Sequence, residues 1–277
     1  MRNGQATLQI AETRFAIKCD YQPFMDWLHD ACRDFLVEGE PHARINLNFD
    51  TSNKESANEP NLAHRYEDDS TSFNITWPGL QDPDDMYRSI LRLFLQYSPA
   101  VNQVADLWVH ASAVIHEDQA FLFTGPSGAG KTTICDILSG KEGFTILHDD
   151  VVILSSGVDG FRAWSSPLHG QKPASRSISA PLRAMFFIHK ANINNVSKLP
   201  GRSVPGLISP AMMLTPWIRT PDGRLFDNTK LSLELILRLA DTVPCYELNF
   251  KADFSFWELI ERTLEEKPSG RSRVSEH

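Results

Sequence analysis

One short segment carries residues whose types and spacing favour phosphate chemistry. Residues 125–132 read Gly-Pro-Ser-Gly-Ala-Gly-Lys-Thr, which fits the pattern G-x-x-x-x-G-K-[ST] at every fixed position. The segment follows an apolar run at residues 120–123, so the sequence predicts a strand, a glycine-rich loop and a helix in succession. The residues predicted to surround a nucleotide are Gly125, Pro126, Ser127, Gly128, Ala129, Gly130, Lys131, Thr132 and Thr133.

A loop of this kind binds ATP and a magnesium ion through different groups. Glycine allows the backbone to curve so that successive N–H groups point at a phosphate, and the following helix adds the positive end of its dipole. In this pattern Lys131 reaches the β- and γ-phosphates, and the Thr132 hydroxyl binds the Mg²⁺ that bridges them. The sequence therefore predicts nucleotide binding, with ATP and Mg²⁺ as cofactors. The competing interpretation is a glycine-rich turn without a ligand.

A second candidate for chemistry is the sequence His148-Asp149-Asp150, which lies between apolar runs at residues 144–147 and 151–154. Two adjacent carboxylates at the edge of a buried strand provide for two roles, because one can hold magnesium while the other accepts a proton from an attacking hydroxyl. The alternative is an ordinary turn between strands, since side chains at neighbouring strand positions face opposite ways.

The third candidate is His110, which precedes Gly125 by 15 residues. If the strands on either side of Glu117 and Asp118 pair as a hairpin, His110 lies at the depth of the glycine-rich loop. It would then contact the γ-phosphate or the nucleophile. A histidine considered alone is more often a core residue, so the functional interpretation depends on the hairpin.

The elements around these residues include more strands than helices. Apolar and alternating patterns predict strands at residues 108–115, 119–124, 145–147, 151–154 and 184–188. Only one clear helix, at residues 132–139, lies among them, whereas a doubly wound parallel sheet alternates strand and helix throughout. We therefore predict an α/β fold with a mixed sheet around the loop. Further elements are predicted at residues 224–239 (helix), 246–250 (strand) and 254–264 (helix).

Residues 1–105 carry no recognisable chemistry and are predicted to form a smaller α+β region. The patterns there predict a hairpin of strands 7–10 and 14–18, a helix at 23–37, strands at 43–49 and 72–77, and a helix that begins at Asp82. Residues 51–61 are polar and are predicted to form an exposed loop. The predicted organisation is this region, a catalytic domain at residues 106–266 and a disordered tail at residues 267–277.

Composition and charge limit the classes of partner. In a chain of 277 residues, 27 basic and 35 acidic side chains give a net charge of −8, and the basic residues form no cluster that favours nucleic acid. No apolar run approaches the roughly 18 residues of a membrane span. We therefore expect a cytoplasmic protein with neither a nucleic-acid nor a membrane partner. The four cysteines are scattered without a C-x-x-C pair, which argues against a zinc site or a disulfide framework, and Cys135 is expected to be a small core residue.

Three segments taken together resemble a known family of phosphotransferases. They are His110-Ala111-Ser112-Ala113-Val114, residues 123–132, and His148-Asp149-Asp150-Val151-Val152. This succession is similar to the catalytic domain of HPr kinase/phosphorylase and its smaller relatives, which include bacterial kinases that phosphorylate a serine of lasso-peptide precursors. The resemblance covers residues 105–190. It implies a P-loop domain with a mixed sheet, related to the fold of phosphoenolpyruvate carboxykinase.

The resemblance also implies a role for each matching residue. Asp149 would act as general base toward a serine hydroxyl, Asp150 would help to hold magnesium, and His110 would lie near the transferred group. Lys131 and Thr132 would grip the nucleotide phosphates. The glycine-rich signature with an arginine that HPr kinase/phosphorylase carries after its acidic pair has no convincing match here. Neither the reverse, phosphate-driven reaction nor the partner HPr is therefore implied.

The basic side chains nearest in sequence for steadying a transferred phosphoryl group are Arg176 and, second, Lys172. Each is equally consistent with a solvated loop charge. Other loops, at residues 167–179 and 201–216, are expected to shape the acceptor site, and the prolines of the second suggest an irregular cover that acts as a lid.

The function that these patterns favour is Mg-ATP-dependent transfer of the γ-phosphate to a hydroxyl, with serine of a peptide or small protein, such as a lasso-peptide precursor, as the acceptor. Two alternatives share the same groups. One is a kinase of a small molecule such as free serine, and the other is a regulatory ATP- or GTP-binding module with slow hydrolysis. The resemblance includes oligomeric relatives, so a homo-oligomer is one possible state, but no residue pattern here specifies it.

Overall fold

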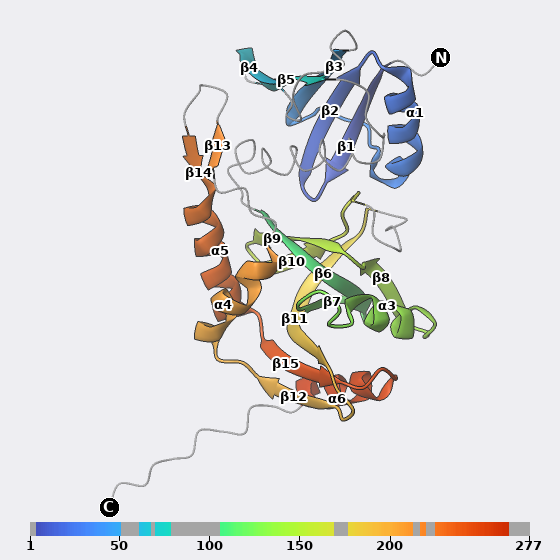
Figure 1. Ribbon diagram of the computed structural model, residues 1–277, viewed down its shortest axis with the longest axis vertical. Helices are drawn as coiled ribbons and strands as arrows, with labels where there is room; N and C mark the ends of the chain where they lie inside the picture. The colour runs from blue at the N-terminus through green and yellow to red at the C-terminus, as the bar shows by residue number, and fades with distance from the viewer. Residues whose placement is uncertain are drawn as a thin grey trace, which may run out of the picture.

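The computed structural model describes residues 4–50, 61–67, 70–78, 106–168, 177–212, 217–219 and 225–265 (Figure 1). Several predictions from the sequence lie outside these ranges. They concern most of the polar loop at residues 51–61, the helix from Asp82, the tail at residues 267–277, and the basic residues Lys172 and Arg176. Within the part of the chain that is described, no helix is both long and apolar enough to cross a membrane.

The N-terminal region forms a five-stranded sheet in the order β1-β2-β3-β5-β4. Its strands are β1 (Gln5–Ile10), β2 (Thr13–Cys19), β3 (Ala43–Asp50), β4 (Asn61–Glu67) and β5 (Ser70–Pro78). The predicted hairpin is confirmed, because β1 and β2 pair antiparallel with Leu8 opposite Phe15. Strand β4 was not predicted from the sequence.

The predicted helix at residues 23–37 is wrong in length. Helix α1 (Gln22–Ala31) ends six residues earlier, and the chain continues through a short 3₁₀ turn, η1 (Arg33–Phe35). The reason is tertiary pairing: the Val37 N–H donates to the Thr7 carbonyl over 2.9 Å, and Leu36 forms a bridge with Leu8. These contacts hold the chain extended along β1, so the helix cannot continue.

The larger sheet has eight strands and mixed directions. The strands are β6 (Asp106–His116), β7 (Gln119–Thr124), β8 (Phe144–His148), β9 (Val151–Gly157), β10 (Gly160–Trp164), β11 (Ser179–Lys190), β12 (Asn195–Lys198) and β15 (Cys245–Phe250). Their order is β10-β9-β6-β7-β11-β15-β12, with β8 paired to β6. Strands β7, β11 and β15 are parallel, whereas β6 runs antiparallel to β7. The predicted mixed sheet is therefore confirmed.

Helices cover both faces of this sheet (Figure 1). The helices α3 (Lys131–Ser139) and α6 (Ser255–Glu265) pack on one face, and α4 (Val204–Ile208) and α5 (Asn228–Thr242) pack on the other. Strand β11 shows why the two layers separate, because side chains alternate along a strand. Met185 and Phe187 belong to the core beside α4 and α5, while Phe186 and Ile188 belong to the core beside α3 and α6.

The structure corrects three further expectations. The strands β10 and β12 were not predicted, and α5 begins at Asn228 rather than at residue 224. The helix starts late because the preceding residues form β14 (Leu225–Asp227), which pairs antiparallel with β13 (Trp217–Arg219). Cys135 is fully buried in the core between α3 and the sheet, as expected for a small core residue.

The core of the N-terminal sheet also contains residues of the larger sheet. Trp108 from β6, Val151 and Ile153 from β9, and Leu168 are buried together with residues of β1, β2, β3 and α1. Strands β6 and β9 therefore contact the N-terminal sheet. These strands also bear on the predicted site, because β6 contains His110 and β9 begins directly after Asp150.

Candidate functional site

The glycine-rich segment forms the turn between β7, which ends at Thr124, and α3, which begins at Lys131. Two glycines in it adopt backbone angles that side chains rarely allow, with φ of +79° at Gly128 and +108° at Gly130. A Cβ atom on Gly130 would also lie 2.5 Å from the Phe250 ring. The loop thus depends on glycine both for its conformation and for its close packing on β15.

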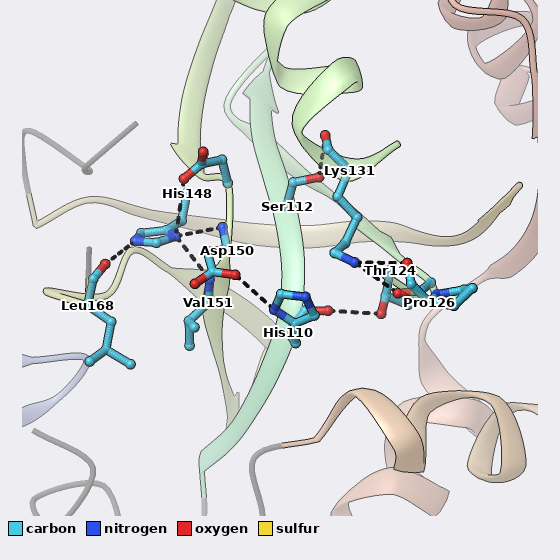
Figure 2. A network of polar contacts seen from close by, with 11 residues as sticks. His110, Ser112, Thr124, Pro126, Lys131, His148, Asp150, Val151 and Leu168 are labelled. Atoms are coloured by element: carbon cyan, nitrogen blue, oxygen red, sulfur yellow. Dashed lines mark hydrogen bonds and ion pairs between the residues drawn. The ribbon is translucent and has the colours of Figure 1, made fainter. Parts of the chain in front are cut away.

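Lys131 is held at the centre of this loop. Among the described residues, its ammonium group donates to the Gly125 carbonyl over 2.9 Å and to the Pro126 carbonyl over 3.2 Å (Figure 2). An ammonium group has three N–H bonds, so a third donor remains for a ligand. Burial lowers the pKa of Lys131, and the nearby Asp150 carboxylate opposes this shift. The Ser112 hydroxyl donates to the Lys131 carbonyl over 3.2 Å and so fixes the first turn of α3 to β6.

The hairpin predicted from the sequence is present. Strands β6 and β7 pair antiparallel with Ala111 opposite Thr124, and the turn between them has positive φ at Glu117 and Asp118. The Thr124 hydroxyl donates to the His110 carbonyl over 3.2 Å. His110 therefore lies beside the start of the glycine-rich loop, as the hairpin requires.

His110 and Asp150 form a hydrogen-bonded pair. The His110 Nδ1 lies 2.9 Å from the Asp150 Oδ1, and both side chains are about four-tenths exposed (Figure 2). The hydrogen bond from His110 lowers the pKa of the Asp150 carboxyl, burial opposes this, and the charges of His110 and Lys131 lower it further. Asp150 is therefore a carboxylate near neutral pH, and it lies within the electrostatic reach of Lys131.

The break between β8 and β9 places the Asp150 side chain next to His110. Strands β8 and β9 pair in succession with the same neighbour, β6, and Asp149 and Asp150 lie between them. The Ala111 N–H donates to the Asp150 carbonyl over 2.9 Å, which fixes the backbone of the interruption.

The ring of His148 supports this turn from inside. Its Nδ1 accepts the N–H groups of Asp150 and Val151, each over 3.0 Å, and its Nε2 lies 2.7 Å from the Leu168 carbonyl. Two donors at Nδ1 require a lone pair there, and a carbonyl at Nε2 requires a hydrogen, so the network assigns the neutral Nε2–H tautomer. His148 is fully buried. The sequence placed it in the motif but gave no indication of this supporting role.

The two adjacent carboxylates have different surroundings. The Asp149 side chain is 1% exposed and its Oδ1 lies 4.0 Å from the His148 Nδ1, whereas the Asp150 side chain is 41% exposed. This difference agrees with the expectation that neighbouring positions face opposite ways. The partly exposed Asp150 and His110 thus lie together within electrostatic reach of the buried Lys131, and Asp149 lies in the interior.

Thr132 and Thr133 lie in the first turn of α3 and are half-buried. The donor set fits magnesium better than a metal that needs a full protein cage, because Mg²⁺ keeps several waters and takes one or two protein ligands together with phosphate oxygens. Asp150 supplies an ionised carboxylate and Thr132 a hydroxyl. No group of three or more histidine, cysteine, aspartate or glutamate residues suited to a metal occurs among the residues described.

A hollow of about 320 Å³ lies between the start of the glycine-rich loop and the segment around α4. It is lined by His110, Gly125, Pro126, Ser127, Phe187, Ile188, His189, Gly206, Leu207, Pro210 and Ala211. The sequence predicted the loop side and an irregular covering segment at residues 201–216. The described part of that segment, residues 201–212, consists mainly of α4 and two flanking 3₁₀ turns, and residues 213–216 lie outside the described ranges. The sequence gave no indication of His189, because only the register of β11 beside β7 brings that residue to the hollow.

The chain matches a known family model. The family model described as ScmC, SynChlorMet cassette protein ScmC, matches residues 84–265. This range covers more than half of the chain and includes the glycine-rich loop, His110 and both aspartates, so the chain belongs to this family. No curated protein matches the sequence.

Proposed function

We propose that this member of the ScmC family is a magnesium- and ATP-dependent kinase that transfers the γ-phosphate to a serine hydroxyl of a peptide or small protein. One observation carries the proposal. The first residues of the glycine-rich loop and His110 line the same hollow, while Lys131 is anchored to that loop and Asp150 is bonded to His110, so groups suited to phosphate binding and to proton transfer are adjacent.

The phosphate-binding half of the proposed site consists of backbone N–H groups and the ammonium group of Lys131. The loop of residues 125–130 and the start of α3 provide N–H groups for the phosphates, and Lys131 places its ammonium group among them. Its two bonds to loop carbonyls hold the charge in position before a nucleotide arrives. Groups that are fixed in this way stabilise developing negative charge without having to reorganise.

The proton-accepting half consists of His110 and Asp150. Asp150 accepts the Nδ1–H of His110 and thereby leaves the Nε2 lone pair available for the proton of an acceptor hydroxyl. A base must touch the hydroxyl that it deprotonates. Because Asp149 is buried and His110 lines the hollow, the proposal revises the role that the family resemblance implied and assigns the base to His110, oriented by Asp150.

The hydroxyl of Thr132 and the carboxylate of Asp150 are the groups that would hold magnesium. When bound, the ion neutralises charge on the β- and γ-phosphate oxygens. In the transfer, the serine oxygen bonds to the γ-phosphorus, the bond to the leaving ADP oxygen breaks, and the serine proton moves to His110.

The test is a transfer assay with γ-labelled ATP and magnesium. Serine-containing peptides and free serine are offered as acceptors to the wild type and to Lys131→Ala. We expect label on a peptide with the wild type and none with the variant, because the variant lacks the loop cation. Label on free serine alone would identify a metabolite kinase. Release of phosphate without any labelled acceptor would favour the regulatory nucleotide-binding module.

A further inference from the structure

A second hollow adjoins the first. It measures about 410 Å³ and is lined by Phe187, His189, Leu199, Ser203, Gly206, Leu207 and Glu247. Four of these residues, Phe187, His189, Gly206 and Leu207, also line the hollow beside the glycine-rich loop. The two hollows therefore share a wall, and we call them the inner hollow, at the loop, and the outer hollow.

His189 of the shared wall forms a second histidine–carboxylate pair with Glu247, which lines the outer hollow only. The His189 Nε2 lies 3.7 Å from the Glu247 Oε1, and the side chains are 50% and 45% exposed. His189 lies near the carboxyl end of β11, the edge at which α/β sheets bind ligands, whereas Glu247 lies in the middle of the parallel strand β15. His110 and His189 thus line the inner hollow from opposite sides of the glycine-rich loop.

Among the described residues that line the outer hollow, Glu247 is the only carboxylate and none is lysine or arginine. Its partner His189 carries a positive charge only when it is protonated, so the permanent charge that these residues bring to the hollow is negative. Lys198 and Arg202 neighbour two lining residues in the sequence but do not line the hollow themselves. The rest of its surface is mainly apolar, with Leu207 44% exposed. A ligand that fills it should therefore combine an aliphatic stem with a positive charge, which describes the side chain of lysine or arginine.

We propose that the inner and outer hollows together form the acceptor site and take an extended peptide in which a basic residue neighbours the phosphorylated serine. The inference rests on the proposed kinase function, which it makes more specific. The serine occupies the inner hollow beside His110, and the basic side chain occupies the outer hollow against Glu247 and Leu207. Free serine would fill the inner hollow only, so the second hollow favours a peptide over a free amino acid.

Gly206 offers a way to block this site without disturbing the loop. It lines both hollows, and a Cβ atom placed on it would meet no atom within 4 Å. Gly206→Trp should fill the hollows and lower transfer to a peptide by about a hundredfold, because the acceptor is displaced from its reacting position. ATP binding should stay unchanged. Gly140→Trp is the control for a tryptophan at another open glycine, away from both hollows, and it should act as wild type.

Reversing the charge at Glu247 tests the predicted preference for a basic residue beside the phosphorylated serine. Two peptides that differ only in Lys or Glu beside the serine are compared for kcat/KM and for binding by fluorescence anisotropy. The wild type should prefer the lysine peptide by about two- to fivefold, the effect of a half-exposed ion pair. Glu247→Lys should reverse the preference, whereas Glu234→Lys, on the exposed face of α5, should leave it unchanged.

The outcomes separate this inference from the proposed function. Transfer to both peptides with no preference, or a preference that Glu247→Lys does not alter, would overturn the inference and leave the kinase intact. Transfer to free serine that is faster than transfer to either peptide would overturn it as well. If no acceptor is labelled, the kinase proposal fails, while binding of the lysine peptide that Gly206→Trp abolishes would still support the site.

Discussion

At the scale of single residues, the adjacent Asp149 and Asp150 have different surroundings because a buried histidine fixes the turn that carries them. The buried ring of His148 accepts the N–H groups of Asp150 and Val151 and holds the turn in which Asp150 reaches His110. The sequence identified all the residues of this arrangement, because they lie in short recognisable segments. It could not show which carboxylate faces solvent, since that depends on the interruption between β8 and β9 along β6.

His148→Ala should destabilise the protein markedly. The substitution removes the partner of two N–H groups and of the Leu168 carbonyl, and buried groups left without partners cost about 1–3 kcal/mol each. We expect a loss of about 2–4 kcal/mol in the free energy of unfolding, measured with urea. His189→Ala, which changes a half-exposed histidine, should cost less than about 0.5 kcal/mol. Equal effects of the two substitutions would contradict the supporting role of His148.

His110 and Asp150 should behave as one catalytic unit. His110→Ala and Asp150→Asn are each expected to lower kcat by about a hundredfold or more, and the double variant should be little worse than either single one. Asp149→Asn should retain more activity than Asp150→Asn. A fully additive double variant, or an Asp149→Asn protein that is inactive while Asp150→Asn is active, would return the role of base to Asp149.

Acid should remove the stabilising contribution of Asp150. Its folded pKa lies below the ordinary carboxyl value of 3.8 because His110 donates a hydrogen bond to it. Its contribution to stability is therefore present above that ordinary value and is lost as the pH falls through the lower folded pKa. The difference in unfolding free energy between the wild type and Asp150→Asn should shrink from about pH 6 to about pH 3. A difference that grows as the pH falls would mean that folding raises the pKa of Asp150 instead of lowering it.

At the scale of elements, the glycine-rich loop is the segment least tolerant of change. Gly130→Ala puts a side chain where φ is +108° and where its Cβ would lie 2.5 Å from the Phe250 ring. We expect a loss of about 1–3 kcal/mol in stability and weaker ATP binding, measured by urea unfolding and by calorimetry. Gly140→Ala at the end of α3 has open space and ordinary φ, so it should change neither quantity. ATP binding that is unaltered by Gly130→Ala would mean that the loop is not the phosphate site.

The elements that the sequence predicted correctly are those with a strong local pattern. Strands β6, β7 and β11 are long and apolar, and the pattern of α3 follows directly from the glycine-rich loop. The short strands β10 and β12 are five and four residues long and escaped prediction. Strand β12 depends on the distant β15, whereas β10 forms a hairpin with the neighbouring β9 that its short pattern did not indicate. Helix α1 stops early for a similar reason, since the chain after it pairs with β1.

At the scale of the whole molecule, the candidate site lies where the carboxyl ends of β7 and β11 meet the hairpin partner β6 and the segment around α4. The mixed sheet could be predicted from the excess of strands over helices. The hollows could not, because their walls come from residues between 110 and 247 that only the strand order brings together. This arrangement places the start of the glycine-rich loop and His110, with its partner Asp150, beside the two adjoining hollows, as the proposed transfer requires.

The most direct test of the central claim is a single-turnover measurement of the γ-phosphate of labelled ATP with excess enzyme, magnesium and the lysine-flanked serine peptide. The account predicts that label leaves ATP and appears on the peptide serine at the same rate. It also predicts that Asp150→Asn binds ATP but transfers label to the peptide about a hundredfold or more slowly. Label that appears only as free phosphate, at a rate that Asp150→Asn shares, would contradict the assignment of this site to phosphate transfer.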